Sequence, residues 1–333
     1  MKAKKMSVFT VSMMIAAAVV SLRGLPMMAK EGTTMFFYIL FSALMFLIPA
    51  SLVSAELGGA FSKEQGGVYT WVKEAFGAKW GFTAIWLQWI QNVVWYPAVL
   101  WFAAACLAYV FLDPSLSGNG YYTGAVILIS YWAATLLALR GSHTAGPVTK
   151  YGFLLGTIVP GPLIIALGAL WLHQGNPLQF AQASQALGAV KAAVVGPHVR
   201  YFPDLSNLGN VAFLAGIILL FAGVEVHAVH ATHMKNPAKQ FPLSIFLASV
   251  VILLLFILDS FAIATVIPAE KISLTAGLMQ AFRHMLATFN ISFLLPVMGL
   301  LVSFGAIGQV MSWVDGPSRG LLETAKDLSL IHI

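Results

Sequence analysis

Eight long apolar stretches dominate this sequence, and each is long enough to cross a lipid bilayer as a helix. Such a helix needs roughly 20 consecutive apolar residues. Because 59% of the residues are hydrophobic and only 9% are charged, a soluble core with a charged surface is excluded. The sequence therefore predicts an all-α transmembrane protein with about eight spans, near residues 7–30, 34–58, 80–111, 121–139, 151–172, 209–232, 242–266 and 291–314.

The lysines and arginines between the spans predict the orientation in the membrane. Cytoplasmic loops of membrane proteins carry an excess of these residues. With the N-terminus in the cytoplasm, twelve of the eighteen basic residues lie inside, five lie outside and one, Arg23, lies within the membrane. The basic residues form no clustered stripe, so no nucleic-acid partner is expected.

Two of the expected spans are interrupted by glycine near their middles, and each interruption carries one charge. Secondary transporters hold a polar solute where two helices unwind at corresponding positions of two repeats, because backbone N–H and C=O groups are free there. Four intact spans separate the two interruptions, so the second is expected to begin a five-helix repeat of which three spans are present. The expected substrate-binding residues are Ser21, Leu22, Arg23 and Gly24 at the first break and Phe221, Ala222, Gly223 and Glu225 at the second.

Several short segments, in order along most of the chain, match those of a known family. They are Ser54-Ala55-Glu56-Leu57, residues 66–72, Tyr201-Phe202-Pro203-Asp204, Gly223-Val224-Glu225 through Met234-Lys235-Asn236-Pro237, and residues 312–320. On these segments the chain resembles bacterial amino-acid permeases of the amino acid, polyamine and organocation superfamily, most closely the glutamate/GABA antiporter group. The first break, however, differs from those antiporters.

The resemblance implies a leucine-transporter-like inverted-repeat bundle, here with about eight spans and an incomplete second repeat. It also implies exchange of an amino acid for its decarboxylation product, in a bacterial cytoplasmic (inner) membrane with the N-terminus cytoplasmic. The family continues into four more helices after residue 327. We therefore expect residues 1–327 to form a single, C-terminally truncated transporter domain, followed by an atypical tail at residues 328–333.

Arg23 and Glu225 are the two charges at the breaks, and each has two interpretations. A charge at the centre of a span costs roughly 3 kcal/mol, so Arg23 needs a partner. Its guanidinium has the fork geometry that suits a substrate carboxylate. The alternative is a permanent ion pair with Glu225 across the two breaks. Glu225 is accordingly either a proton-linked group near the substrate amino group or a static partner of Arg23 or of backbone donors.

Three histidines, His227, His230 and His233, recur every three residues at the inner end of the sixth span. Histidine exchanges protons between pH 5 and 8, so these residues join Glu225 as candidate proton-linked or pH-sensing groups. The alternative places them at the interface, facing headgroups or the loop before Lys235. No metal site is expected, because residues three apart drift around a helix and no further donors converge there.

Other polar residues in the spans have structural interpretations as well. Asp259 is expected to pack toward the bundle with a hydroxyl partner beside Ser260, and an ion or proton role is the alternative. Gln88, with the neighbouring amides Gln91 and Asn92, is expected to make interhelical hydrogen bonds or to line a transport cavity. Asp315 is expected at the inner end of its span, near Arg319.

No nucleophile elbow, phosphate-binding loop, dinucleotide glycine motif or zinc protease signature occurs, so we expect neither an enzyme nor a cofactor. The expected function is secondary transport or antiport of an amino acid, with an acidic one favoured. The expected partners are that solute and the lipid bilayer, and oligomerisation is left open. Two alternatives remain: exchange of a basic amino acid for its amine, or a non-transporting truncated fragment or sensor.

Overall fold

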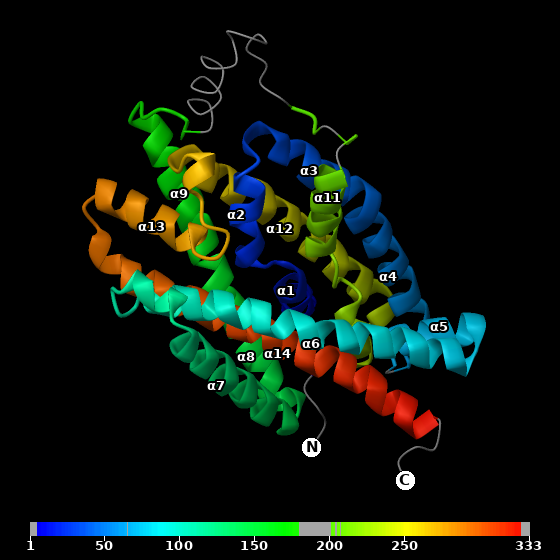
Figure 1. Cartoon of the computed structure of the whole chain (residues 1–333). Helices are drawn as coiled ribbons and strands as arrows, with labels where there is room; N and C mark the ends of the chain where they lie inside the picture. The colour runs from blue at the N-terminus through cyan, green and yellow to red at the C-terminus, as the bar shows by residue number, and fades with distance from the viewer. Residues whose placement is uncertain (1–4, 65, 180–200, 204, 207, 328–333) are drawn as a thin grey trace.

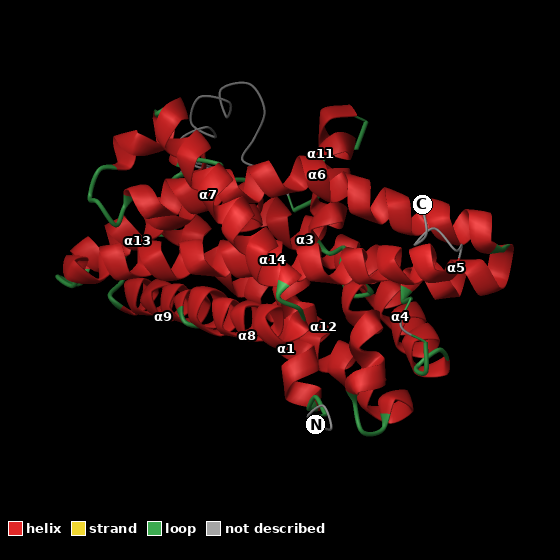
Figure 2. Ribbon diagram, turned by 90° about the horizontal axis from the view of Figure 1, so that it is seen from below, coloured by secondary structure: helices red, strands yellow, loops and turns green. Residues whose placement is uncertain are grey.

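The computed structural model of this chain describes residues 5–64, 66–179, 201–203, 205–206 and 208–327. These residues form a bundle of helices packed side by side (Figure 1). Within this part of the chain, extended pairing is limited to an isolated bridge between Met6 and Met234 (Figure 2). The predicted all-helical architecture is therefore confirmed for the described residues.

Seven helical stretches of the described chain are long and apolar enough to cross a membrane. Several of them are interrupted by a 3₁₀ or π turn, so one span carries more than one helix label. In chain order they comprise α1 (Val8–Val19), η1 (Leu22–Gly24) and α2 (Leu25–Ala29); η2 (Gly32–Thr34), α3 (Met35–Ser42), η3 (Ala43–Leu47) and α4 (Ile48–Ala60); α6 (Ala78–Ala108); α7 (Gly120–Leu139); α8 (Ser142–Phe153), η5 (Leu154–Ile158) and α9 (Pro160–His173); α12 (Pro237–Val266); and η8 (Ser292–Leu294) with α14 (Leu295–Asp327).

The sixth expected span, residues 209–232, does not form one membrane-length helix. It consists of the short helix α11 (Leu208–Leu220), a non-helical turn around Gly223 and the 3₁₀ segment η6 (Val226–His233). At 1.5 Å per residue, the 13 residues of α11 reach only about 20 Å. The structure thus has seven candidate spans and one divided segment where the sequence predicted eight spans. The last span also continues to Asp327, beyond the expected end at 314.

Four further helical segments of the described chain connect the spans. They are α5 (Val68–Phe76), which precedes α6, η4 (Pro114–Gly118), which precedes α7, and the pair η7 (Ala269–Lys271) and α13 (Gly277–Thr288), which precede α14.

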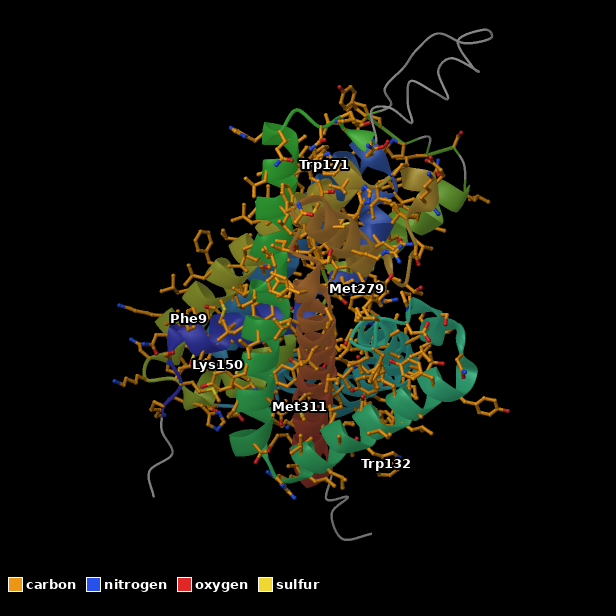
Figure 3. The ribbon with its side chains drawn as sticks, turned by 90° about the vertical axis from the view of Figure 1, so that its left-hand side faces the viewer. Phe9, Trp132, Lys150, Trp171, Met279 and Met311 are labelled. Atoms are coloured by element: carbon orange, nitrogen blue, oxygen red, sulfur yellow. The ribbon has the colours of Figure 1, made fainter. Side chains whose placement is uncertain are left out.

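Helix α14 runs through the middle of the bundle, alongside α6 (Figures 1 and 3). Met311 of α14 is fully buried, whereas Trp132 of α7 points outward with 59% of its surface exposed (Figure 3). Large apolar side chains are exposed on α3, α4, α6 and α7 as well. In water such exposure is unfavourable, but here it provides the lipid-facing surface of a membrane protein.

Glycines allow the fifth span to cross α14 at very short range. A Cβ atom added at Gly156 would lie 2.3 Å from the Cα of Gly305, and one added at Gly152 would lie 3.0 Å from the Cα of Gly308. Small residues permit such close backbone approach between membrane helices, where van der Waals contact replaces the hydrophobic driving force. This crossing holds α14 against the fifth span beside the first break.

Candidate functional site

The first break is a short extended segment between α1 and the turn η1. Val20 and Ser21 have extended backbones, with φ/ψ of −68°/109° and −114°/109°. Helix α2 then begins at Leu25 with Pro26 in its first turn, where the missing N–H of proline is tolerated. The chain therefore leaves helical geometry in the middle of an apolar span and leaves the last carbonyls of α1 without helical donors.

The second break is centred on Gly223, whose φ is +122°. This left-handed backbone region favours glycine, because a side chain there is strained. A Cβ atom at Gly223 would also lie 2.8 Å from the Trp313 ring and 3.5 Å from Val19 at the end of α1. Glycine is thus required here both for the turn and for the close approach.

The structure brings the two breaks together. Gly24 of the first break lies against Leu220 at the end of α11, where an added Cβ would be 2.7 Å from the leucine Cδ1. Val19, on the other side of the first break, lies next to Gly223. The two interruptions, about 200 residues apart in the sequence, therefore form one region of irregular backbone inside the bundle.

Helix α14 satisfies the free carbonyls of the first break. The Gln309 amide donates hydrogen bonds to the carbonyl oxygens of Ala18 and Val20 at 3.3 and 3.2 Å. The Trp313 indole N–H donates to the Ala18 carbonyl at 2.9 Å. All of these atoms are buried, where an unpaired carbonyl would be costly in the absence of water.

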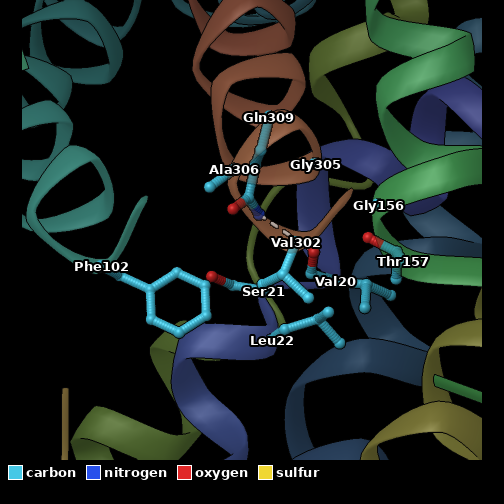
Figure 4. A pocket seen from close by; sticks show the side chains of 10 residues that line it. All are labelled: Val20, Ser21, Leu22, Phe102, Gly156, Thr157, Val302, Gly305, Ala306 and Gln309. Carbon is cyan, nitrogen blue, oxygen red and sulfur yellow. Dashed lines mark hydrogen bonds between the residues drawn. The ribbon is translucent and has the colours of Figure 1, made fainter. Parts of the chain in front are cut away.

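A small cavity adjoins this break (Figure 4). Ser21 and Leu22 of the break, Phe102 of α6, Thr157 of the fifth span and Gln309 of α14 contribute to its lining. Its volume is about 10 Å³, which is room for about one water molecule. In this conformation the region is closed around the break, so an amino acid would need the helices to move apart.

Arg23 and Glu225 do not form the ion pair that was one interpretation of the sequence. Arg23 makes no ion pair with any described residue, and its Nε is buried without a hydrogen-bond partner there. Glu225 instead accepts a hydrogen bond at 3.1 Å from the Gln88 amide of α6. The interhelical role predicted for the amides thus applies to Gln88, and the guanidinium of Arg23 remains available.

The three histidines lie in η6 at the inner side of the second break. His227 shares a hydrogen bond of 2.8 Å between its Nε2 and the Ser312 hydroxyl of α14. The His230 Nε2 lies 3.4 Å from the Asp315 carboxylate, which also pairs with Arg319 at 3.1 Å. His227 and His230 are buried, so they do not face headgroups as the alternative had it. His233 lies next to His230, with ring centroids 6.0 Å apart.

Polar contacts tie the N-terminal segment to η6 and the end of α14 to α5. The Met6 N–H donates to the His233 carbonyl at 2.8 Å, which ties the N-terminal segment to η6. On α5, Lys73 forms an ion pair of 2.8 Å with Asp327 at the end of α14, and the Tyr69 hydroxyl donates to the same carboxylate. The hydrogen bond to Asp327 raises the pKa of Lys73. The pKa of Tyr69 is raised by burial and by Asp327.

Comparison with known proteins assigns the chain to a family. A family model described as amino acid permease matches residues 6–331. The chain belongs to the amino acid permease family. Members of this family are transporters and not enzymes, so the permease is a multi-pass membrane protein whose family implies an amino acid substrate.

Individual relatives of the permease agree with this assignment. An uncharacterized transporter of Legionella pneumophila is 38% identical over 327 residues, covering 98% of this chain and 67% of the relative. A glutamate/gamma-aminobutyrate antiporter of Lactococcus lactis is 30% identical over 328 residues, covering 98% and 62%. A probable agmatine/putrescine antiporter of Lactococcus lactis is 27% identical over 318 residues, covering 94% and 62%. The permease thus spans about two thirds of the length of these relatives.

Sequence reasoning missed Gln309, Trp313 and Thr157 as residues of this region. Gln309 is a polar amide in an otherwise apolar stretch of the last span, and this contrast could have marked it as a candidate. Trp313 lies within the segment 312–320 that resembles the family, but its partner, a carbonyl 295 positions earlier, cannot be inferred from one sequence. Thr157 carries no sequence signal of this kind.

We expect Trp313→Phe to destabilise the permease by about 0.5–1.5 kcal/mol, because the buried Ala18 carbonyl loses its indole donor and keeps only the longer hydrogen bond from Gln309. The matched control is Trp95→Phe: Trp95 contacts the Trp313 ring at 5.8 Å between centroids and donates no hydrogen bond to a described residue. The thermal unfolding midpoint of the purified protein in detergent should fall clearly further for Trp313→Phe. Equal shifts for the two variants would contradict this role.

Proposed function

We propose that this permease is a secondary antiporter for amino acids that binds its solute between the two breaks. The observation that carries the proposal is the contact between the breaks at Gly24 and Leu220, next to the half-buried Arg23, whose guanidinium forms no ion pair with a described residue and whose buried Nε has no partner there. In the leucine-transporter-like arrangement that the family implies, unwound backbone at two such points binds the solute. We also propose that the N-terminus is cytoplasmic in a bacterial cytoplasmic membrane, as the distribution of basic residues favours.

The substrate we favour is an acidic amino acid such as glutamate, exchanged for its decarboxylation product. Arg23 would bind a carboxylate through its fork, while Glu225 and free carbonyls would face the amino group. Two observations support this choice: the free guanidinium at the first break, and the relatives named as glutamate/gamma-aminobutyrate antiporters. The proposed substrate-binding residues are then those named for the two breaks. Gln309 and Trp313 stabilise the first break through their hydrogen bonds to its carbonyls.

Exchange of a basic amino acid for its amine is the second candidate. Its supporting observation is that Glu225 is engaged by a neutral amide rather than by a cation, so its charge is available to a cationic solute. The relative named as a probable agmatine/putrescine antiporter points the same way. Competition by glutamate and by agmatine against uptake of each labelled solute distinguishes the two candidates.

Replacing Arg23 tests the proposed carboxylate site. We expect Arg23→Ala to abolish glutamate exchange in vesicles reconstituted with the purified protein. Arg23→Lys should keep only a fraction, since lysine supplies the charge without the fork. The matched control is Arg283→Ala, which removes an exposed arginine on α13. Unchanged counterflow of labelled glutamate in Arg23→Ala would remove Arg23 from the site.

We further propose that exchange rises on acidification through Glu225 or the histidines of η6. Glu225 lies at the break, and His230 contacts Asp315, so protonation in either place changes the charge there. The pH dependence should flatten in Glu225→Gln or in the triple variant His227→Asn, His230→Asn, His233→Asn. If both variants keep the parent's pH profile, neither group senses protons. Glu56→Gln, at the inner end of α4, serves as the control.

A further inference from the structure

Asp259 is a buried acid in the last third of the seventh span that none of the roles above uses. It lies in α12 with no exposed surface, and neither carboxyl oxygen has a hydrogen-bond partner in the described structure. The hydroxyl partner expected from the sequence is not found, because the Ser260 hydroxyl next to it is also unpartnered there. The Asp259 carboxyl group therefore lies in an apolar region without a hydrogen-bond donor from the described residues.

The surroundings of Asp259 leave room for a carboxyl group but supply no hydrogen-bond donor to it. A Cβ atom added at Gly161 of α9 would lie 3.1 Å from the Asp259 Oδ2 and 3.2 Å from Leu255, so the carboxyl group lies against bare glycine backbone. Helices α9 and α12 pack against each other at this level (Figure 1). Any side chain at residue 161 would crowd the acid.

No charged group compensates an ionised Asp259. The helices packed against α12 are α1, α2, α3, α4, α9, α13 and η6. None of their titratable groups in the described structure, nor Lys239 of α12 itself, forms an ion pair or hydrogen bond with Asp259. Those groups are Arg23 beside α2, Tyr38, Glu56, His173, Arg283, His284 and the three histidines of η6.

A metal or alkali cation does not fit this site. Hard cations take about six or more oxygen ligands, whereas no second acidic side chain among the described residues is found in contact with Asp259. In the described residues no group of three or more histidine, cysteine or acidic side chains is placed to hold a metal ion. A proton, by contrast, needs no ligand beyond a single carboxylate oxygen, so one carboxyl group can bind it.

We propose that Asp259 is a proton-binding site between the fifth and seventh spans, and that its proton exchanges with solvent. An ionised acid without a partner is costly inside a membrane protein, and binding a proton removes that charge. The inference does not depend on which solute the permease carries, nor on the proposed exchange activity.

Infrared spectroscopy of the purified 333-residue chain in lipid nanodiscs tests this site directly. At neutral pH we expect a carbonyl stretch of a protonated carboxyl group that is absent in Asp259→Asn and shifted in Asp259→Glu. The asparagine variant mimics the shape of the neutral acid, so it should fold, which gel filtration checks. Glu323→Gln is the matched control, because Glu323 forms an exposed ion pair of 2.7 Å with Lys326 and should contribute no such band.

Two results would overturn the proposal. If the protonated-carboxyl band is the same in the parent and in Asp259→Asn, Asp259 is ionised. If the band assigned to Asp259 does not shift after prolonged incubation in D₂O, the proton is sealed in and no exchange with solvent occurs. A band that is lost in Asp259→Asn and shifted by D₂O supports both parts. Neither readout involves transport, so a failure here is separate from a failure of the proposed antiport.

Discussion

The hydrogen bonds from α14 to the end of α1 are the interaction on which the rest of this structure depends. A helix that stops inside a bilayer exposes carbonyls where no water can reach them, and each would cost several kcal/mol if left unpaired. Gln309 and Trp313 supply the missing donors for Ala18 and Val20. The glycine crossing at Gly156 and Gly305 in turn holds α14 close to the fifth span. A broken first span is therefore tolerated because a later span replaces its lost helical bonds.

The same helix connects the breaks to the inner end of the bundle. Below Trp313, α14 contacts η6 through Ser312 and Asp315, and its final residue, Asp327, is bound by Lys73 of α5. These contacts hold η6, α5 and the end of α14 together, while the cavity at the first break has a volume of only about 10 Å³. The ion pairs of this region, from Asp315 to His230 and Arg319 and from Asp327 to Lys73, all involve the second half of α14.

Much of the architecture follows from hydropathy and glycine, whereas the pairing of polar groups does not. Lipid allows only helices or closed barrels, so the apolar stretches predicted helices, and Gly24 and Gly223 marked the two breaks. The interruption of the sixth span at Gly223 was predicted, but its division into a 13-residue α-helix and a 3₁₀ segment was not, because apolar residues continue on both sides of the turn. The interpretation of Arg23 and Glu225 as an ion pair was wrong, since charge alone suggested the pair and Gln88 reaches Glu225 instead. Contacts between residues hundreds of positions apart depend on helix rotation, which one sequence does not specify.

The central claim is that the first break forms the solute site. The rate at which a thiol reagent labels a single cysteine placed there tests it most directly. Ser21→Cys would be introduced with Cys106→Ala, which removes the native cysteine. We expect glutamate or its exchange partner to slow reaction of this cysteine with a thiol reagent, while Tyr121→Cys, at a position that is 92% exposed, reacts at the same rate with and without solute. Equal labelling of Ser21→Cys in the presence and absence of every amino acid and amine tested would contradict the account.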